Sequence, residues 1–584
     1  MENNWNEKGL TGYPSIDKPW LKYYSEEAIN APLPECTIYE YLWENNKDHL
    51  DDIALVYFGR KITYKELFEN IDKAARAFSA IGVKTGDICT VVSLSCVNSI
   101  IVFYALNRIG AISNYISVIA SETEFQSYFD DTKSKYVVTM DLFADKVLTA
   151  AKKAEIKKII SFSLSDYMPY SVKLGYKIKM PRIDTNYLLD SNVIQWTTFL
   201  KFADTLTESE WSHDCNSISI WAHTGGTTGF PKTVLLTDKA YNASAMQYMK
   251  SMAHNRKDVF LNIMPPFIVY GMLTCMHMPL SLGLTVVIIP KFEAENWCKY
   301  IKDYMPNHIA GIPSYFIPML QDEKLKRTDL SCIHTFAAGG DGLNEKLEHD
   351  LNLFLSEHGS KAKLIKGYGM TEVCSSAITA FGDYSKIGSV GIPLVKNSIK
   401  IYDNDNMNEC KYNETGEILL SSPSLMVSYK DNEKETNDLI ITDKNGTKWV
   451  HTGDLGYVDE QGFLFLIGRM KRFIFVCPEG LPYKVFPKKI EDVIISVSCI
   501  LEVCVVSTNT GNGFAPIAYI VLKKGVTESK EHITENIKKV CEEQLPDYLQ
   551  PFRYEFLESL PKTSIGKVDY KALEKLAEEK ANGK

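Results

Sequence analysis

Residues 217–237 read SISIWAHTGGTTGFPKTVLLT, and this stretch is the most informative one in the chain. A β-branched run leads into a loop with three glycines, three threonines and one lysine, and a second apolar run follows. Glycines let backbone N–H groups approach an anion, threonines add hydroxyl donors, and a lysine supplies positive charge. The stretch therefore predicts a strand–loop–strand unit that binds a polyphosphate through Thr224, Gly225, Gly226, Thr227, Thr228, Gly229 and Lys232.

Two other interpretations of this loop were weighed. A Walker-type loop needs Gly directly before its Lys and a helix after it. Here Phe230 and Pro231 precede Lys232 and a strand is expected next, so the Walker loop is excluded on both counts. A flexible surface hairpin is the structural alternative, and the regular spacing of glycines and hydroxyls favours phosphate binding over it.

Outside the loop, short β-branched runs alternate with longer amphipathic segments, which predicts an α/β fold. A hairpin is expected around Gly59–Arg60. A helix is expected to follow from about Tyr64, with Thr63 as its N-cap and Glu66 completing a capping box.

Three further short strands are expected to end in glycine, in HIAGIP (308–313), HTFAAGG (334–340) and KLIKGYG (363–369). Glycine-rich turns at one edge of a sheet are where α/β proteins place ligands. Residues 165–212 are rich in aromatic residues but irregular, and their pattern predicts no role.

The pattern changes along the second half of the chain. From Ile399 it becomes strand-and-turn without long helices, and after Arg469 mixed strands and helices resume. Residues 469–584 carry 18 basic and 16 acidic side chains, a net charge of +2, which leaves −11 for the rest. We predict a large N-terminal domain at 1–468 and a small C-terminal lid domain at 469–584.

Composition excludes several classes of protein. The chain has 584 residues, of which 45% are apolar and 23% charged, with a net charge of −9. Disorder and a general nucleic-acid binder are excluded, because the chain is globular in composition and has no excess of cations. Thirteen scattered cysteines without CxxC spacing, and no secretory leader, predict a reducing, cytoplasmic location.

Residues 259–290 form an uncharged run of 32 residues, which is long enough for a membrane span. Four prolines interrupt it, however, and would break any single spanning helix. We therefore expect no transmembrane segment here, but a buried strand at 259–264, an apolar helix at about 272–282 and a buried strand at 285–289.

The segment HTGGTTGFPK (223–232) resembles the phosphate-binding signature of the acyl-adenylate-forming enzymes, which include acyl-CoA synthetases, luciferases and peptide-synthetase adenylation domains. Further similar motifs follow in the family's order over nearly the whole chain: KITYKEL (61–67), PPFIVYG (265–271), GYGMTE (367–372), TGE (415–417), HTGD (451–454), GRMKR (468–472) and PKTSIGK (561–567). The resemblance implies an α/β fold with a large N-terminal domain of several subdomains, in which sheets pack with helices beside a distorted β-barrel. It also implies a small, mobile C-terminal α+β domain.

In GYGMTE, the resemblance implies that Tyr368 and Gly369 contact the adenine, Thr371 donates to a phosphate and Glu372 holds Mg²⁺. A capped helix start would account for Thr371 and Glu372 equally well, and only the other motifs favour the binding roles. Gly339 and Gly340 lie in the segment that flanks the adenine in the family.

Two further motifs carry implied roles. Asp454 of HTGD accepts the ribose hydroxyls, with Arg469 nearby, although a lone Asp on a Gly turn is more often structural. Lys567 of PKTSIGK is the catalytic lysine, which bridges the carboxylate and the α-phosphate. A fixed cation suits this step, because an anionic carboxylate must attack an anionic phosphate.

The remaining site residues lie where the chain departs from the family's pattern. The acyl pocket is expected to draw on Phe267, Ile268, Ser314, Tyr315 and Gly339, with Ile268 replacing the frequent His. Arg472 occupies the hinge position, where an acidic residue or lysine is usual, and Gly225 replaces the usual Ser of the phosphate loop. The segment after GRMK is four residues longer than the common spacing, which weakens the case for the CoA step.

The resemblance implies a ligase that uses ATP and Mg²⁺ to convert a carboxylic acid to acyl-AMP and then to a CoA thioester. A medium- or long-chain fatty acid is the expected substrate, with an aromatic acid next. A carrier protein as the thiol acceptor, and a non-enzymatic adenylate-binding scaffold, are the open alternatives. The expected partners are the small acid, ATP and CoA, with no nucleic acid, and a homodimer is left open.

Overall fold

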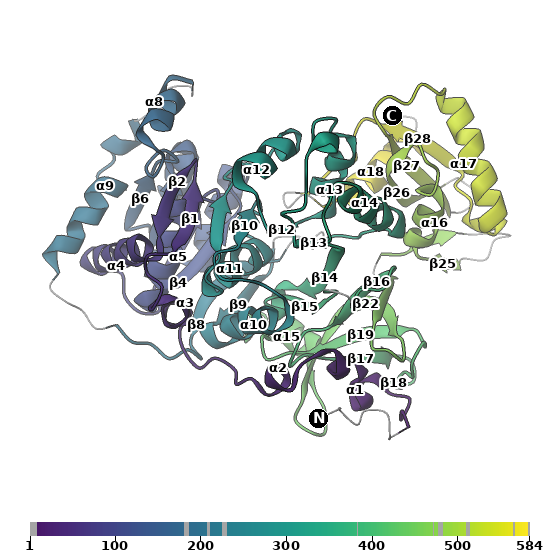
Figure 1. Cartoon of the computed structure of the whole chain (residues 1–584), viewed down its shortest axis with the longest axis horizontal. Helices are drawn as coiled ribbons and strands as arrows, with labels where there is room; N and C mark the ends of the chain where they lie inside the picture. The colour runs from purple at the N-terminus through teal and green to yellow at the C-terminus, as the bar shows by residue number, and fades with distance from the viewer. Residues whose placement is uncertain are drawn as a thin grey trace.

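The computed structural model describes residues 9–179, 186–206, 211–224, 231–381, 384–470, 472–476, 483–509, 514–563 and 567–581. Two large sheets and a small C-terminal sheet organise these residues (Figure 1). The mixed α/β architecture confirms the fold class expected from the sequence.

The first large sheet has eight strands in the order β20-β9-β8-β4-β3-β5-β6-β7. The strands from β8 to β7 in this order are parallel, while β9 pairs antiparallel with β8 and β20 antiparallel with β9. Their bounds are β3 Ile88–Val92, β4 Ile112–Ile116, β5 Tyr136–Met140, β6 Lys158–Phe162, β7 Val193–Gln195, β8 Ile218–His223, β9 Thr233–Thr237 and β20 Ser428–Tyr429.

The second sheet has a parallel half and an antiparallel half. The parallel half consists of β1 (Ile53–Tyr57), β11 (Thr285–Ile288), β10 (Val259–Asn262), β12 (His308–Gly311), β13 (Thr335–Gly339) and β14 (Leu364–Met370), with β2 (Arg60–Thr63) antiparallel at its edge. The antiparallel half continues through β15 (Ser375–Thr379), β16 (Ser389–Pro393), β23 (Leu464–Arg469), β22 (Lys448–Val458), β19 (Gly416–Ser421), β17 (Ser398–Asp403) and β18 (Asn408–Glu409), and β21 (Ile440–Thr442) pairs with β22. Most strands of this half lie in the region after Ile399, where the sequence predicts strands and turns without long helices.

Helices join the two large sheets into one core. The helices α3 (Ile38–Asn46), α5 (Val97–Arg108), α10 (Asp238–Ser251) and α11 (Met278–Ser281) pack on one another, and their apolar side chains meet those of both sheets. The remaining longer helices of this region are α4 (Tyr64–Ala80), α6 (Glu122–Thr132), α7 (Ala144–Ala151), α12 (Trp297–Tyr304) and α14 (Glu345–Glu357).

The C-terminal region has its own cores. The strands β26 (Ile500–Asn509), β27 (Phe514–Leu522) and β28 (Arg553–Leu557) form a three-stranded sheet, and β24 (Ile474–Val476) pairs with β25 (Tyr483–Val485). The helices α16 (Pro487–Ile494), α17 (Lys530–Gln544) and α18 (Tyr570–Ala581) cover the sheet. Figure 1 shows this region beside α14, at the opposite end of the molecule from β6 and α9 (Trp196–Phe199). A domain boundary after residue 468 remains our proposal.

The uncharged run is core, as the sequence predicts, but its helix differs in detail. A π-helical segment, η5 (Tyr270–His277), precedes α11, so the helical part starts two residues before the expected Met272. His277 is fully buried between the Tyr104 hydroxyl and the Asn242 side chain, both at 3.0 Å. In the described part of the chain, no helix combines the length and apolarity needed to cross a bilayer.

Two local expectations are corrected by the structure. Thr63 caps α4 by accepting from the Glu66 N–H, but the Glu66 carboxylate pairs with Arg60 instead of closing a capping box. The irregular segment 165–212 contains a ten-residue helix, α8 (Tyr170–Lys179), together with η3 (Asn186–Leu189), β7, α9 and η4 (Leu200–Thr205).

Candidate active site

The predicted ligand edge of the parallel half is closely packed. A Cβ added to Gly339 at the end of β13 would lie 3.4 Å from the Gly367 carbonyl oxygen and 3.6 Å from the Tyr270 ring. The Tyr270 hydroxyl donates to the Gly311 carbonyl at 3.3 Å. Tyr270 of η5 therefore lies across the ends of β12 and β13, which positions the uncharged run at this edge.

Gly369 is required by the packing of the sheet itself. A Cβ at this position would lie 2.0 Å from the Ser375 carbonyl oxygen on the neighbouring strand β15. Gly340 has a φ of +80°, a left-handed conformation that favours glycine. From the sequence alone, a glycine that the backbone requires cannot be distinguished from a glycine that contacts an adenine.

Tyr368, Asp454 and Arg469 meet in one hydrogen-bonded group, as expected for a ribose site. The Tyr368 hydroxyl donates to one Asp454 carboxylate oxygen at 2.8 Å, and the Arg469 Nε lies 3.0 Å from the other. Asp454 and Arg469 are direct partners across β22 and β23. Burial raises the pKa of the Asp454 carboxyl, and Arg469 opposes this rise.

Glu372 is buried in the short turn η9 (Thr371–Val373), beside a residue that the sequence analysis missed. The Tyr429 hydroxyl donates to Glu372 Oε1 at 2.5 Å. The Lys232 ammonium lies 4.7 Å from the centre of the Tyr429 ring and pairs with Glu435. Tyr429 therefore links the expected metal carboxylate to the lysine of the phosphate loop. Tyr429 belongs to the two-residue strand β20, and the pairing of β20 with β9 brings it to the site.

The base of the phosphate loop is closed by backbone contacts. The Thr224 N–H donates to the Lys232 carbonyl at 3.0 Å, and the Lys232 N–H donates to the Thr224 hydroxyl at 3.2 Å. The loop joins β8 to the antiparallel β9, as the sequence predicts. The other expected phosphate ligands, Gly225, Gly226, Thr227, Thr228 and Gly229, lie outside the described residues.

Lys567 from the C-terminal region lies close to the groups of the N-terminal region. Burial lowers the pKa of the Lys567 ammonium, and the carboxylates of Asp341, Asp454 and Glu372 oppose this fall. The Lys567 N–H donates to the Thr563 hydroxyl at 3.2 Å, which closes the PKTSIGK loop. The structure thus brings the expected lysine near Asp454 and Glu372, and it adds Asp341, to which the sequence pattern assigned no role.

Arg472 is held by the C-terminal region. Its Nη2 donates to Glu491 Oε1 at 2.8 Å and to Cys504 Sγ at 3.4 Å, and its guanidinium lies 5.2 Å from the centre of the Tyr570 ring. Although burial opposes the charge, the Glu491 carboxylate raises the pKa of Arg472. Arg472, the expected hinge residue, is therefore bound to the C-terminal region.

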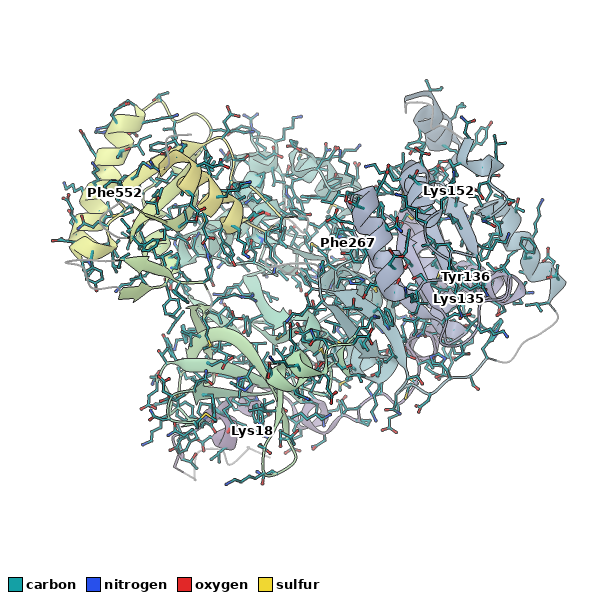
Figure 2. All side chains as sticks on the ribbon, turned by 180° about the vertical axis from the view of Figure 1, so that it is seen from behind. Lys18, Lys135, Tyr136, Lys152, Phe267 and Phe552 are labelled. Atoms are coloured by element: carbon teal, nitrogen blue, oxygen red, sulfur yellow. The ribbon has the colours of Figure 1, made fainter. Side chains whose placement is uncertain are left out.

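The expected acyl-pocket residues lie at the surface of the apolar cores. Phe267 and Ile268 are half-buried just before η5, and Phe267 lies near the middle of the molecule (Figure 2). Ser314 and Tyr315 are half-buried in α13 (Pro313–Phe316), where the Tyr315 ring centre lies 4.6 Å from that of Phe292. Phe267 and Ile268 lie within the uncharged run, and Ser314 and Tyr315 follow β12, which pairs with β10 of that run.

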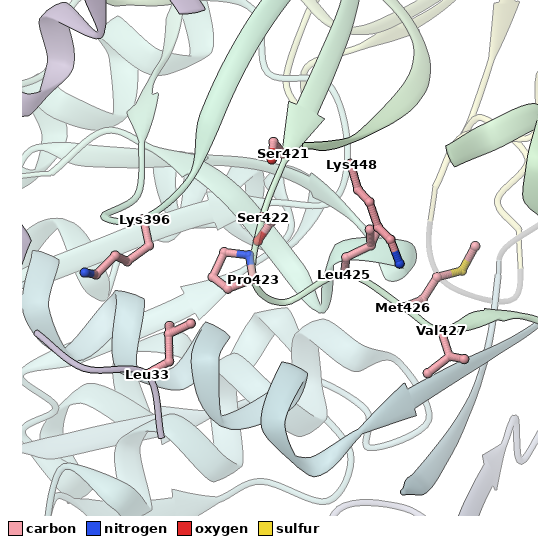
Figure 3. Close-up of a pocket in the computed structure, with 9 residues that line it drawn as sticks. All are labelled: Leu33, Lys396, Ser421, Ser422, Pro423, Leu425, Met426, Val427 and Lys448. Atoms are coloured by element: carbon pink, nitrogen blue, oxygen red, sulfur yellow. The ribbon is translucent and has the colours of Figure 1, made fainter. Parts of the chain in front are cut away.

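A cavity of about 580 Å³ lies apart from the expected acyl pocket (Figure 3). Its lining includes none of the predicted site residues and consists of Leu33, Lys396, Ser421, Ser422, Pro423, Leu425, Met426, Val427 and Lys448. The Met426 N–H donates to the Glu372 carbonyl at 2.8 Å, so this lining segment supports the turn that carries Glu372.

Comparisons with known proteins identify the family of the chain. Residues 42–430 match the AMP-binding enzyme family, and residues 489–567 match the AMP-binding enzyme C-terminal domain. The chain therefore belongs to the AMP-binding enzymes. This membership and the CoA-ligase relatives confirm the enzyme class predicted from the sequence, an AMP-forming acid–thiol ligase.

Two relatives and two solved structures illustrate the similarity. A long-chain-fatty-acid–CoA ligase of Bacillus subtilis (strain 168) is 27% identical over 94% of this chain and 96% of its own length. The 4-coumarate–CoA ligase CCL1 of Humulus lupulus is 26% identical over 93% of this chain and 94% of its own. The structure of the anthranilate CoA ligase AuaEII with anthranoyl-AMP has a TM-score of 0.79 at 20% identity, over 95% of this chain and 99% of that one. ATP-bound MatB from Rhodopseudomonas palustris has a TM-score of 0.79 at 19% identity, over 94% of this chain and 100% of that one.

The link between Tyr429 and Glu372 leads to a prediction. Tyr429→Phe removes the hydroxyl that donates to the buried Glu372 carboxylate, so this carboxylate loses the partner that orients it. We expect the Mg²⁺ concentration for half-maximal activity to rise about tenfold, the size typical of the loss of a group that orients a metal ligand. Mg²⁺ titration of carboxylate-dependent pyrophosphate exchange measures this. Tyr402→Phe, which changes an exposed tyrosine hydroxyl far from Glu372, is the control, and an equal response of the two variants would contradict the prediction.

Proposed function

We propose that this enzyme activates a medium- or long-chain fatty acid with ATP and transfers the acyl group to CoA. The observation that carries the proposal is the position of Lys567, which approaches Asp454 and Glu372 from the C-terminal region. The site therefore combines an expected ribose carboxylate, an expected metal carboxylate and a cation from a second region.

In the first half-reaction, a carboxylate oxygen of the acid attacks the α-phosphorus of ATP. The bond to the bridging oxygen breaks, and acyl-AMP and pyrophosphate form. Asp454 accepts the ribose hydroxyls and Arg469 holds Asp454 in place, while Tyr368 fixes the second carboxylate oxygen. Lys567 lowers the repulsion between the two anions, because a positioned cation stabilises charge that develops in the transition state.

The residues around Glu372 suit a magnesium ion bound together with ATP. Mg²⁺ is typically held by one or two carboxylates together with substrate phosphates. Glu372 is buried next to the phosphate-loop lysine, with Oε1 fixed by Tyr429. Glu372 would hold the ion, which when bound would neutralise phosphate charge, and Lys232 would contact the phosphates from the loop.

In the second half-reaction, the CoA thiol gives up its proton and its sulfur attacks the acyl carbonyl carbon, so that AMP leaves. In this mechanism Lys567 acts in the adenylation step, so the C-terminal region must move before another group can reach the acyl carbon. Arg472 is held by Glu491 and would move with the C-terminal region, so the rotation would take place in the backbone between Arg469 and Arg472.

The substrate class rests on the uncharged run and on the relatives. Nearly all side chains of η5 and α11 are buried and most of them are apolar, which suits an aliphatic acid. The relatives named long-chain-fatty-acid–CoA ligase favour the same acid, whereas the relative named 4-coumarate–CoA ligase supports an aromatic acid as the second candidate. The carrier protein remains the alternative acceptor.

A panel of acids tests the substrate class. AMP release is measured with purified enzyme, ATP, Mg²⁺, CoA and acids that range from acetate through octanoate and palmitate to benzoate and 4-coumarate. We expect kcat/KM to be highest for medium or long aliphatic acids. A preference for 4-coumarate over every aliphatic acid would contradict the fatty-acid assignment without affecting the ligase assignment.

The influence of the Asp341 charge on Lys567 predicts a shift in pH dependence. Lys567 must be a cation in the adenylation step, so activity falls as pH rises through its lowered pKa. The Asp341 carboxylate raises that pKa, so Asp341→Asn should lower it and move the alkaline limb of kcat/KM to lower pH. The pH profile of pyrophosphate exchange measures the shift. Glu558→Gln is the control, because it changes an exposed carboxylate of the C-terminal region that also carries Lys567. Its alkaline limb should match that of the wild type. An alkaline limb at the same pH in the wild type, Asp341→Asn and Glu558→Gln would contradict the prediction.

A further inference from the structure

Helix α8 (Tyr170–Lys179) presents an apolar stripe to the solvent. Tyr170, Leu174 and Ile178 are 83%, 53% and 76% exposed, and they follow one another at intervals of four residues. Residues at this spacing share one face of an α-helix. Exposed apolar side chains are ordinary when isolated, but three in a row on one helix face form a patch that points to a partner.

The opposite side of the helix anchors it to the protein. Val172 and Tyr176 pack against the main core, so the outward direction of the stripe is fixed by packing. The neighbouring element η3 (Asn186–Leu189) packs on the α7 region through Tyr187 and Leu188, while Leu189 is 84% exposed. Figure 1 shows α8 at the extreme end of the molecule, where it projects beyond the first sheet.

The chain is strongly basic around this stripe. Residues 146–189 hold nine Lys or Arg and three Asp or Glu, whereas the whole chain has a net charge of −9. Helix α8 itself carries lysines and no acidic residue. Lys152 and Lys153 are exposed at the end of α7, and Lys152 lies in the same part of the molecule as α8 (Figure 2). We name the exposed side chains Tyr170, Leu174, Ile178 and Leu189, with Lys152 and Lys153, the α8 patch.

We propose that the α8 patch docks on the surface of a membrane that contains anionic phospholipids. A helix that lies in the interface buries its apolar stripe among the acyl chains and places its lysines near the headgroups. Tyrosine is suited to this position because its ring is apolar and its hydroxyl polar. Each Lys or Arg near an anionic surface adds to the attraction, and the attraction is screened by salt.

The positive charge around the α8 patch favours an anionic membrane over a second copy of the chain as the partner. Two α8 patches placed face to face would bring two segments of net charge +6 together, and like charges at an interface oppose association. An anionic bilayer complements both features of the patch at once, the apolar stripe and the surrounding positive charge. The proposal is independent of the acid that the enzyme activates.

Vesicle co-sedimentation of the full chain without ATP, acid or CoA tests the proposal. The vesicles contain phosphatidylcholine alone or phosphatidylcholine with about 30% phosphatidylglycerol, at low and at high salt. We expect binding to the anionic vesicles at low salt and little binding to the neutral ones. The double variant Leu174→Ser/Ile178→Ser should bind at least about tenfold more weakly, because the stripe supplies the apolar burial.

Two matched variants make the result specific. Lys152→Glu/Lys153→Glu should also weaken binding to anionic vesicles, whereas Phe552→Ser, which removes an exposed aromatic side chain of the C-terminal region, should not. Activation of octanoate in solution should stay unchanged in all three variants, since none of these residues lies at the adenylate site. Equal binding of wild type and Leu174→Ser/Ile178→Ser, or binding without dependence on anionic lipid, would overturn the proposal. A wild-type dimer in solution that becomes a monomer in that variant would assign the patch to a second copy instead.

Discussion

Lys567→Ala is expected to lower carboxylate-dependent exchange of pyrophosphate into ATP by at least about a hundredfold, the size typical of a lost transition-state donor. The lysine is half-buried, and the carboxylates of Asp341, Asp454 and Glu372 act on its charge. Our proposal places this cation where the carboxylate and the α-phosphate meet. ATP binding should change little, because Lys232, Asp454 and Arg469 remain in place. Isotope exchange measures the first quantity and ATP titration by calorimetry the second.

Lys562→Ala is the matched control for this loss. Lys562 lies five residues earlier in the same loop and pairs with Glu502 at 2.5 Å, away from the adenylate site. Exchange by this variant should stay within about twofold of wild type, as expected for loss of a surface ion pair. Unchanged exchange in Lys567→Ala would exclude Lys567 from the adenylation step.

Asp454→Ala is expected to have the second large effect, a rise of at least about a hundredfold in the KM for ATP. The variant removes the proposed acceptor of the ribose hydroxyls and leaves Arg469 and the Tyr368 hydroxyl without their shared partner. Because Arg469 is 68% exposed, we expect the lost contact with the ribose, and not the lost ion pair, to account for most of the rise. Steady-state kinetics with ATP as the varied substrate measures the rise.

Asp459→Ala is the control that distinguishes a loss of ATP binding from a loss of folding stability. Asp459 is also buried and pairs with Lys386 at 2.6 Å, at the far end of the same strand pair. This variant should lower the thermal unfolding midpoint without raising the KM for ATP. If the two variants raised the KM equally, Asp454 would have no specific part in nucleotide binding.

The parts predicted from the sequence are those with a local signature. The strands β12, β13 and β14 were recognisable because each is a short, mostly apolar run that leads into glycine. The loop between β8 and β9 was recognisable because glycine, threonine and lysine gather within ten residues. The family's motif order then identified Asp454 and Lys567.

The parts missed depend on contacts between distant residues. Tyr429 reaches Glu372 from 57 positions away, because the two-residue strand β20 pairs with β9. Glu66 fits a capping box locally, but Arg60 of the preceding strand competes successfully for its carboxylate. Helix α8 was not predicted because its apolar stripe faces outward, whereas periodicity arguments assume that the apolar face covers a core.

The central claim is that one site makes acyl-AMP and then passes the acyl group to CoA. A single-turnover experiment with ATP labelled at the α-phosphate and palmitate tests it most directly. Before CoA is added, we expect the label in enzyme-bound acyl-AMP, with little free AMP. After CoA is added, the label should appear as AMP together with one equivalent of palmitoyl-CoA. Acyl-AMP that persists in the presence of CoA would contradict the claim and favour a carrier-protein thiol as the acceptor.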